Sequence, residues 1–126
     1  VRRRVRAEAA RRAAAIEPAA QVARRHLRGL RSRIGDPDAH GFAADMGHAL
    51  VTFVAGRAGR PELLMLAREE LVLHPAVGRD AWSGRLATAL EELDAVKFAA
   101  AGLAPDRRAE LCDVFEELIA AAEDAG

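Results

Sequence analysis

The 126-residue chain has no tyrosine, one tryptophan and one cysteine, Cys112. A single cysteine forms no internal disulfide, so a reducing compartment is the simplest interpretation. No apolar run approaches the roughly 20 residues that cross a bilayer as a helix, and no secretory signal is visible. The sequence therefore excludes a disulfide scaffold and predicts no membrane span within the chain.

Alanine and leucine supply most of the apolar residues, which favours helix over sheet. A chain of this length suits one domain that buries roughly two thirds of its unfolded surface. We expect an all-α fold, a small bundle of four to five helices with an Arg/Ala-rich amphipathic N-terminal helical arm. The arm is assigned to residues 1–34 and the bundle to residues 35–126.

The formal net charge is zero, but the charges are unevenly distributed. Up to Ile34 the chain carries 11 arginines against 2 glutamates, a net charge of +9, which leaves −9 for the remainder. A basic arm on an acidic body either folds back onto that body or binds an external anion. The arginines at the start of the arm are Arg2, Arg3, Arg4, Arg6, Arg11 and Arg12.

The arm is predicted to be an amphipathic helix. Its apolar or small residues alternate steps of four and three, which places them on one helical face. Pro18 interrupts this pattern because its ring clashes with the carbonyl four residues back and it donates no hydrogen bond. We expect a kink there, or a fresh helix with Pro18 as its first residue, ending at Ile34-Gly35. The stripe comprises Ala9, Ala13, Ile16, Ala20, Ala23, Leu27, Leu30 and Ile34.

The remaining helices follow the arm. Asp36-Pro37-Asp38 predicts an N-cap, a proline at the first helical position and an acid in the first turn. Turn residues in GRAGRP, HPAVGRD and AAAGLAP separate the later helices. The expected helices cover about residues 37–56 and 67–75, a stretch of about 18 residues that begins near Trp82, and residues 105 to the end.

No catalytic signature is recognisable. His40 and His48 share one helix with Asp45, but histidines eight residues apart lie about 12 Å from each other, too far to bind one ion at about 2 Å per bond. Cys112 would act as a nucleophile only beside a base, and its apolar helical neighbours indicate a core thiol. Adjacent glutamates diverge by about 100° on a helix and are expected to be solvated. We predict no enzyme activity, cofactor, metal or small-molecule ligand.

Three interpretations of the arm remain open. Clustered arginines neutralise nucleic-acid phosphates, but the body is acidic, no aromatic residue precedes Phe42 for base stacking, and no helix-turn-helix is visible. Basic residues beside a membrane helix stay on the cytoplasmic side and gain about 1 kcal/mol each near anionic lipid. In the third interpretation the arm is a solvated helix whose Ala/Leu stripe packs on the acidic bundle, which is compatible with either function.

Four segments then follow one another in order: an Arg/Ala-rich stretch, DPDAHGFAADMGHALVTFVAGRAGRP, LAREEL, and RLATALEELDAVKFAAAGLAPDRRAELCDVFEELIAAAE. Over residues 36–123 this order resembles the cytoplasmic C-terminal region of BatD-type oxygen-tolerance proteins. The matches are core positions rather than catalytic ones, and Ala67 stands where the family has a threonine cap. The matching core residues include Phe42, Met46, Leu50, Phe53, Leu93 and Phe98.

The resemblance implies a single-span protein with a helical tail on the cytoplasmic face of the bacterial inner membrane. The chain begins with Val1 rather than methionine, so we expect the membrane helix before it and the basic arm beside anionic lipid. The implied role is non-catalytic docking of protein partners, namely von Willebrand A-domain proteins and MoxR-type AAA+ ATPases. The alternative is a soluble helical regulator whose basic arm binds nucleic acid or mediates dimerisation.

Overall fold

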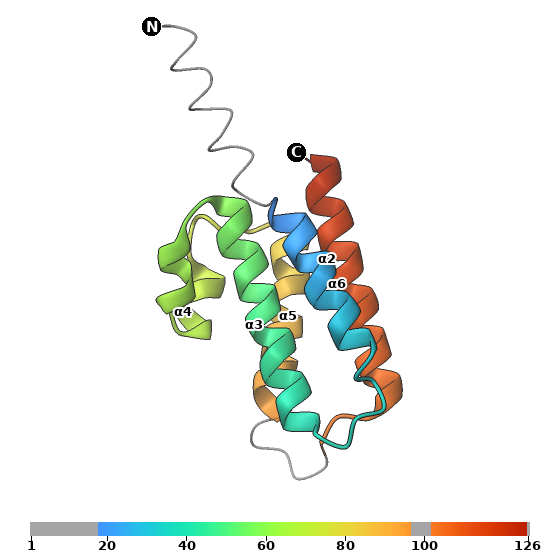
Figure 1. The fold of residues 1–126 in the computed structure, drawn as a ribbon. Coiled ribbons are helices and arrows are strands. Elements are labelled where there is room, and N and C mark those ends of the chain that lie inside the picture. The colour runs from blue at the N-terminus through green and yellow to red at the C-terminus, as the bar shows by residue number, and fades with distance from the viewer. Residues whose placement is uncertain (1–17, 97–101, 126) are drawn as a thin grey trace, which may run out of the picture.

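The structure, a computed structural model, describes residues 18–96 and 102–125. Within these ranges the chain forms five α-helices, one 3-10 helix and no strand (Figure 1). The predicted all-α bundle is confirmed for this part of the chain. The elements are α2 (Ala19–Arg31), α3 (Ala39–Ala58), η1 (Pro61–Met65), α4 (Arg68–Leu73), α5 (Ala81–Val96) and α6 (Pro105–Ala125).

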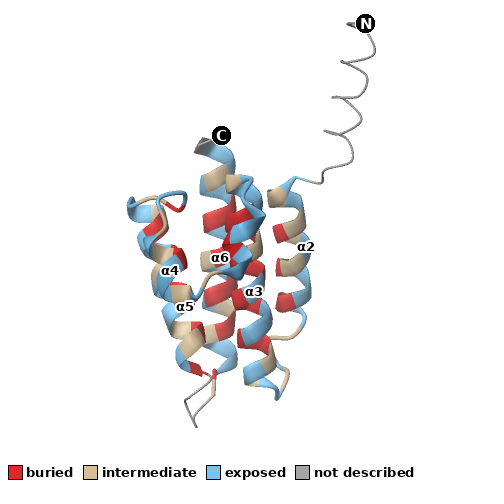
Figure 2. Ribbon diagram, turned by 90° about the vertical axis from the view of Figure 1, so that its left-hand side faces the viewer, coloured by how far each residue is buried: buried red, intermediate tan, exposed pale blue. Residues whose placement is uncertain are grey.

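The helix α3 lies at the centre of the bundle because its sequence is apolar on most sides. Ten of its 20 residues are buried, and a helix of this kind is stable only when other elements surround it. α2 and α6 lie on one side of α3, η1 and α4 on the other, and α5 behind it (Figure 1). Buried residues accordingly lie on the facing sides of the helices (Figure 2). The predicted buried face of Phe42, Met46, Leu50, Phe53 and Val54 is confirmed.

The helix α2 is the described part of the basic arm, and it packs within the bundle. Pro18 is its N-cap, so the predicted fresh helix starts one residue later than expected. The predicted end at Ile34 is wrong, because α2 ends at Arg31 and residues 32–35 form a turn. For residues 19–31 the structure confirms the interpretation in which the Ala/Leu stripe of the arm packs on the helical bundle. The buried stripe residues are Ala23, Leu27 and Leu30.

The start of α3 is displaced from its prediction. Asp38 is the N-cap, and its carboxylate accepts a hydrogen bond from the amide of Gly41 at 2.8 Å. Asp36 instead accepts from the amide of Asp38 at 2.8 Å, so Pro37 precedes the helix rather than opening it. α3 also runs past the predicted end to Ala58, and its C-cap is Gly59, whose φ of 66° is accessible to glycine without steric cost.

Two longer helices complete the bundle. At the start of α5 the carboxylate of Asp80 accepts a hydrogen bond from the amide of Ser83 at 3.0 Å, which lowers the pKa of Asp80. The structure describes α5 from Ala81 to Val96, which is 16 residues of the helix predicted to begin near Trp82. Pro105 is the first residue of α6, as predicted.

Aromatic side chains join α3, α5 and α6 in the core. The ring of Phe53 lies 6.4 Å from that of Trp82 and 6.4 Å from that of Phe115, measured between centroids. Trp82 is half-buried, and its indole nitrogen donates a hydrogen bond to the carbonyl of Leu118 at 2.8 Å. The tryptophan therefore contributes apolar packing while its polar atom stays paired.

Arg108 on α6 is a buried cation with 3% of its surface exposed. Its guanidinium donates to the backbone carbonyls of Leu103 at 2.9 Å, Arg33 and Ile34 at 3.1 Å each, and Asp36 at 2.5 Å. Carbonyls beyond a helix end carry partial negative charge, which offsets part of the cost of burying a cation. Arg108 therefore pairs the backbone carbonyls of the turn that follows α2.

Candidate docking surface

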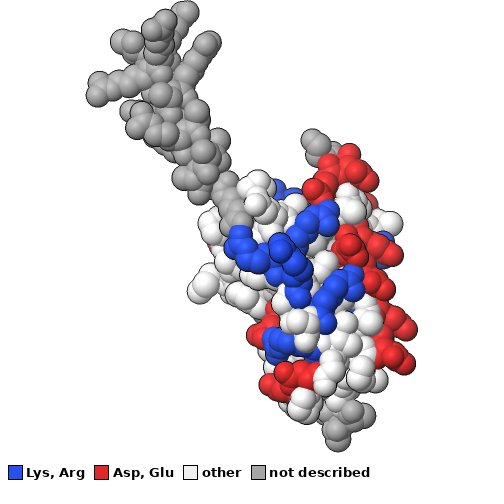
Figure 3. Space-filling model, turned by 45° about the vertical axis from the view of Figure 1, so that its right-hand side comes forward, with Lys and Arg blue, Asp and Glu red and all other residues white. Residues whose placement is uncertain are grey.

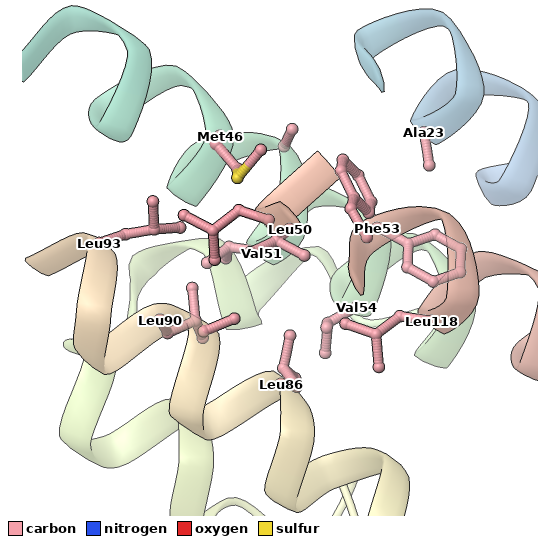
Figure 4. Close-up of a cluster of buried hydrophobic side chains, with 14 of the residues drawn as sticks. Ala23, Met46, Leu50, Val51, Phe53, Val54, Leu86, Leu90, Leu93 and Leu118 are labelled. Atoms are coloured by element: carbon pink, nitrogen blue, oxygen red, sulfur yellow. The ribbon is translucent and has the colours of Figure 1, made fainter. Parts of the chain in front are cut away.

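The residues predicted from the family resemblance are part of the scaffold rather than the surface. Phe42, Met46, Leu50 and Phe53 are at most 3% exposed, and Leu93 is 1% exposed. They meet in one hydrophobic cluster between the helices (Figure 4). Phe98 and the predicted membrane-surface arginines Arg2, Arg3, Arg4, Arg6, Arg11 and Arg12 lie outside the described residues.

Large apolar side chains are exposed on η1 and α4. Leu64 is 44% exposed, Met65 87% and Leu73 72%. We call these three residues the apolar edge. In the part of the chain that the structure describes, no other large hydrophobic residue is exposed. Contiguous exposed apolar side chains are typical of a binding surface, and these three lie within ten residues of the chain.

Two buried leucines fix the apolar edge to the bundle. Leu63 in η1 and Leu71 in α4 are fully buried. In η1 the exposed Leu64 and Met65 follow Leu63 directly, and in α4 Leu73 lies two residues after Leu71. Each of these short helices buries one leucine, so the residues next to that leucine face solvent. This is why the three residues of the apolar edge are exposed.

Arg68 ties α4 to the two helices beneath it. Its Nη1 donates to the carbonyl of Gly47 on α3 at 3.2 Å, and its Nε lies 3.6 Å from Oδ1 of Asp94 on α5. The guanidinium fills space that a side chain at Gly47 would take, since an added Cβ would lie 2.6 Å from Nη2. This contact joins α4, and with it Leu73, to α3 and α5.

Acidic side chains flank the apolar edge. Glu62, Glu69 and Glu70 are exposed. Arg60 lies 3.9 Å from Glu62, a weak ion pair, while the described residues provide no ion pair for Glu69 or Glu70. The edge therefore combines exposed apolar surface with the exposed carboxylates of Glu69 and Glu70.

The face formed by α2 and α6, which we call the charged face, differs from the apolar edge. Arginines of α2 lie beside a row of carboxylates on α6 (Figure 3). Arg24 pairs with Glu123, and Arg31 donates to Asp113 at 3.0 Å and to Glu116 at 2.7 Å. The hydrogen bond to Asp113 raises the pKa of Arg31. Three arginines of the arm, Arg24, Arg31 and Arg33, are thus paired with carboxylates of the rest of the chain.

The candidate chemical groups do not assemble into a reaction centre. His40 and His48 are exposed, and Asp45 pairs with Arg33. Within residues 18–96 and 102–125 no three His, Cys, Asp or Glu residues are placed to hold a metal ion. Cys112 is fully buried, as predicted, and burial raises the pKa of its thiol.

The apolar edge and Arg108 were not identified from the sequence. The segment LLML is visibly apolar, but no periodicity shows that its second and third residues face solvent while its first is buried. Arg108 was also missed, because an Arg-Arg pair at a helix start carries no sign of which member is buried. A buried Arg107 would give the same local sequence.

None of the helices in the described ranges combines the length and the apolar character that a bilayer span requires. Searches against known protein families, curated proteins and solved structures found no match to the chain. The resemblance to BatD-type proteins stays a prediction.

Proposed function

We propose that this chain is a non-catalytic interaction domain that docks a protein partner through the apolar edge. The observation that supports the proposal is the exposure of Leu64, Met65 and Leu73 in one short segment. Burying a leucine or methionine side chain stabilises a complex by about 1.5 to 3 kcal/mol at most. Three such side chains suffice for the centre of a modest interface.

The acidic residues beside the edge favour a protein over a membrane. Glu62, Glu69 and Glu70 would approach the phosphates of an anionic lipid surface and be repelled. A protein with an apolar pocket and basic residues around it would complement both features. The partners implied by the family resemblance, von Willebrand A-domain proteins and MoxR-type AAA+ ATPases, are the candidates to test first.

In the same proposal the domain lies on the cytoplasmic face of the inner membrane, held there by the basic arm of a BatD-like protein. Each lysine or arginine near anionic lipid contributes about 1 kcal/mol. The arginines concerned are those between Arg2 and Arg12. The charged face adds little to this attraction, because Arg24 and Arg31 already pair with carboxylates of α6.

Docking is tested by calorimetric titration of the full chain with purified A-domain and ATPase partners. The variant Leu64→Ser/Met65→Ser/Leu73→Ser should weaken binding by about tenfold or more, because it removes the apolar contacts. The matched control, Ala44→Ser/Ala95→Ser/Ala120→Ser, changes three exposed alanines outside the edge and should bind normally. Equal affinity of the two variants, or no binding by the unaltered chain, contradicts the proposal.

Membrane attachment needs a separate experiment. Deleting residues 1–34 would also remove α2 and its buried residues, so the six arginines from Arg2 to Arg12 should be changed to glutamine in the full chain. We expect the unaltered chain, and not this variant, to sediment with phosphatidylglycerol vesicles at low salt. Arginine-dependent binding to DNA without any preference for anionic lipid would instead support the soluble nucleic-acid-binding regulator.

A further inference from the structure

The described chain begins close to the apolar edge. The start of α2 lies against the end of α3, where a Cβ added to Gly56 would be 3.0 Å from the Cβ of Ala19 (Figure 1). Leu64 follows Gly56 by eight residues, so their Cα atoms are at most about 28 Å apart. The 17 residues before Pro18 span about 55 Å when extended and about 25 Å as a helix. They are long enough to reach the edge.

The sequence of residues 1–17 complements the apolar edge. It carries six arginines against two glutamates, a net charge of +4. Apolar or small residues recur at every third or fourth position, which is typical of a helix with one apolar face. A basic amphipathic segment of this kind suits an apolar surface with acidic residues beside it. The apolar or small residues are Val1, Val5, Ala9, Ala13 and Ile16.

The other acidic surface is less suitable for a basic segment. Carboxylates of α6 that face α2 already pair with Arg24 and Arg31. Beside the apolar edge, Glu69 and Glu70 are exposed and form no ion pair with a described residue. Among the surfaces described above, the apolar edge therefore offers both exposed apolar side chains and carboxylates to pair with arginine.

We propose that residues 1–17 bind the apolar edge of their own chain and keep protein partners away from it. The apolar side chains of the segment cover Leu64, Met65 and Leu73, and its arginines approach Glu69 and Glu70. The contact itself is independent of any partner, but its inhibitory role rests on the proposed function. Anionic lipid competes for the same arginines, so attachment to a membrane frees the edge.

Attachment to the bundle lets a weak contact suffice. Because residues 1–17 are joined to the bundle at Pro18, their effective concentration at the edge is on the order of 1 mM. A dissociation constant of about 0.1 mM between the separate pieces would then keep the edge covered for about nine tenths of the time. A partner would bind the remaining open fraction, with its apparent affinity lowered about tenfold.

The contact is tested by NMR of the full chain with ¹³C-labelled methionine methyl groups. The chain has two methionines: Met65 is 87% exposed at the edge, and the fully buried Met46 is an internal control. Changing the six arginines from Arg2 to Arg12 to glutamine should move the Met65 signal and leave the Met46 signal in place. High salt should move it in the same direction, because salt screens exposed charges. An unchanged Met65 signal in the glutamine variant overturns the proposal.

Two further backgrounds identify the carboxylates involved. In Glu69→Gln/Glu70→Gln the six arginine changes should move the Met65 signal much less, because the carboxylates that they pair with are gone. The matched control, Asp106→Asn/Asp124→Asn, removes two exposed carboxylates of α6 and should keep the full movement. Each movement is measured within its own background, which removes the direct effect of the nearby glutamines. Equal movements in the two backgrounds overturn the proposal.

Dilution distinguishes a contact within one chain from a contact between two copies. A contact within the chain does not depend on concentration, so the position of the Met65 signal should stay the same as the protein is diluted. A signal that moves on dilution toward its position in the glutamine variant would show that the segment of a second copy occupies the edge. That result would overturn the proposal.

The inhibitory role is tested by titrating both proteins with the A-domain and ATPase partners. The glutamine variant should bind up to about tenfold more tightly than the unaltered chain, because its edge is open. Phosphatidylglycerol vesicles should raise the affinity of the unaltered chain and leave that of the variant unchanged. Equal affinities without vesicles overturn the inhibitory role. Absence of binding by both proteins, with the Met65 signal still moved, contradicts partner docking and leaves the contact within the chain supported.

Discussion

The charged face and the apolar edge lie on opposite sides of α3 and differ in whether their interactions are completed within the chain (Figures 1 and 2). On the charged face, Arg24 and Arg31 have carboxylate partners on α6. On the apolar edge, Met65 and Leu73 are mostly exposed. Exposed ion pairs contribute little stability, but they satisfy the charges of that face. Burying these side chains against a partner would be favourable, and nothing in the described part of the chain buries them.

The largest effect is expected where the charged face joins the core. Arg108→Ala should lower the free energy of unfolding by about 4 kcal/mol, because it leaves buried carbonyls unpaired and creates a cavity. Urea unfolding monitored by circular dichroism measures this change. The control is Arg107→Ala, since Arg107 is less buried and pairs with Glu92 and Glu110. That variant should lose less than about 1 kcal/mol. Similar losses for both variants would contradict the role assigned to the buried guanidinium.

Near the apolar edge, substitution of a buried leucine should cost much more stability than substitution of an exposed one. Leu71→Ala should cost about 3 kcal/mol because it removes a fully buried side chain. Leu73→Ala, two residues later and 72% exposed, should cost less than about 0.5 kcal/mol. Thermal unfolding of both variants measures the two losses of stability. A large loss for Leu73→Ala would show that the side chain is packed and unavailable to a partner.

An intermediate effect is expected from the buried thiol of α6. Burial raises the pKa of Cys112, so the unfolded chain loses this proton at lower pH than the folded protein. The associated stability is present below about pH 8.5, the unfolded value, and is lost at higher pH by at most about 1.4 kcal/mol per pH unit. The chain has no tyrosine and a single lysine, so few other groups titrate there. Cys112→Ala should flatten the alkaline limb of stability against pH, and an unchanged slope would contradict this assignment.

The smallest effect is expected from an exposed ion pair. Arg24→Gln, which removes the pair with Glu123, should change the free energy of unfolding by less than about 0.5 kcal/mol. Raising the salt concentration should reduce even this difference, because salt screens exposed charges. Chemical unfolding of both proteins at low and high salt measures it. A loss above about 1 kcal/mol would show that the charged face helps to hold α2 in place.

Much of the fold was predictable because apolar residues at helical spacing indicate both that a segment is helical and which of its faces is buried. Phe42, Met46, Leu50 and Phe53 were predicted to share a face, and all four are buried. Pro105 also opens α6 as its position in the sequence indicated. These predictions depend on local pattern alone.

The errors arose where the local sequence pattern leaves the structure undecided. The turn after α2 is held by Arg108, more than 70 positions away in the chain, which binds the carbonyls of residues 33, 34 and 36. The start of α3 depended on which of two aspartates caps it, and Asp38 does so. The apolar edge was invisible because exposure is a property of packing, and LLML has the same composition whether buried or exposed.

The contact between Arg68 and Gly47 connects the interior to the surface that a partner would bind. A methyl group at position 47 would stand in the place of the guanidinium, and the flexible arginine would have to move away. α4 would keep Leu71 as its buried anchor but would lose its polar link to α3, and this change would reach the partner although the partner never touches Gly47. Affinity can therefore change through two routes: loss of a contact at the interface, or a smaller population of the α4 orientation that is competent to bind.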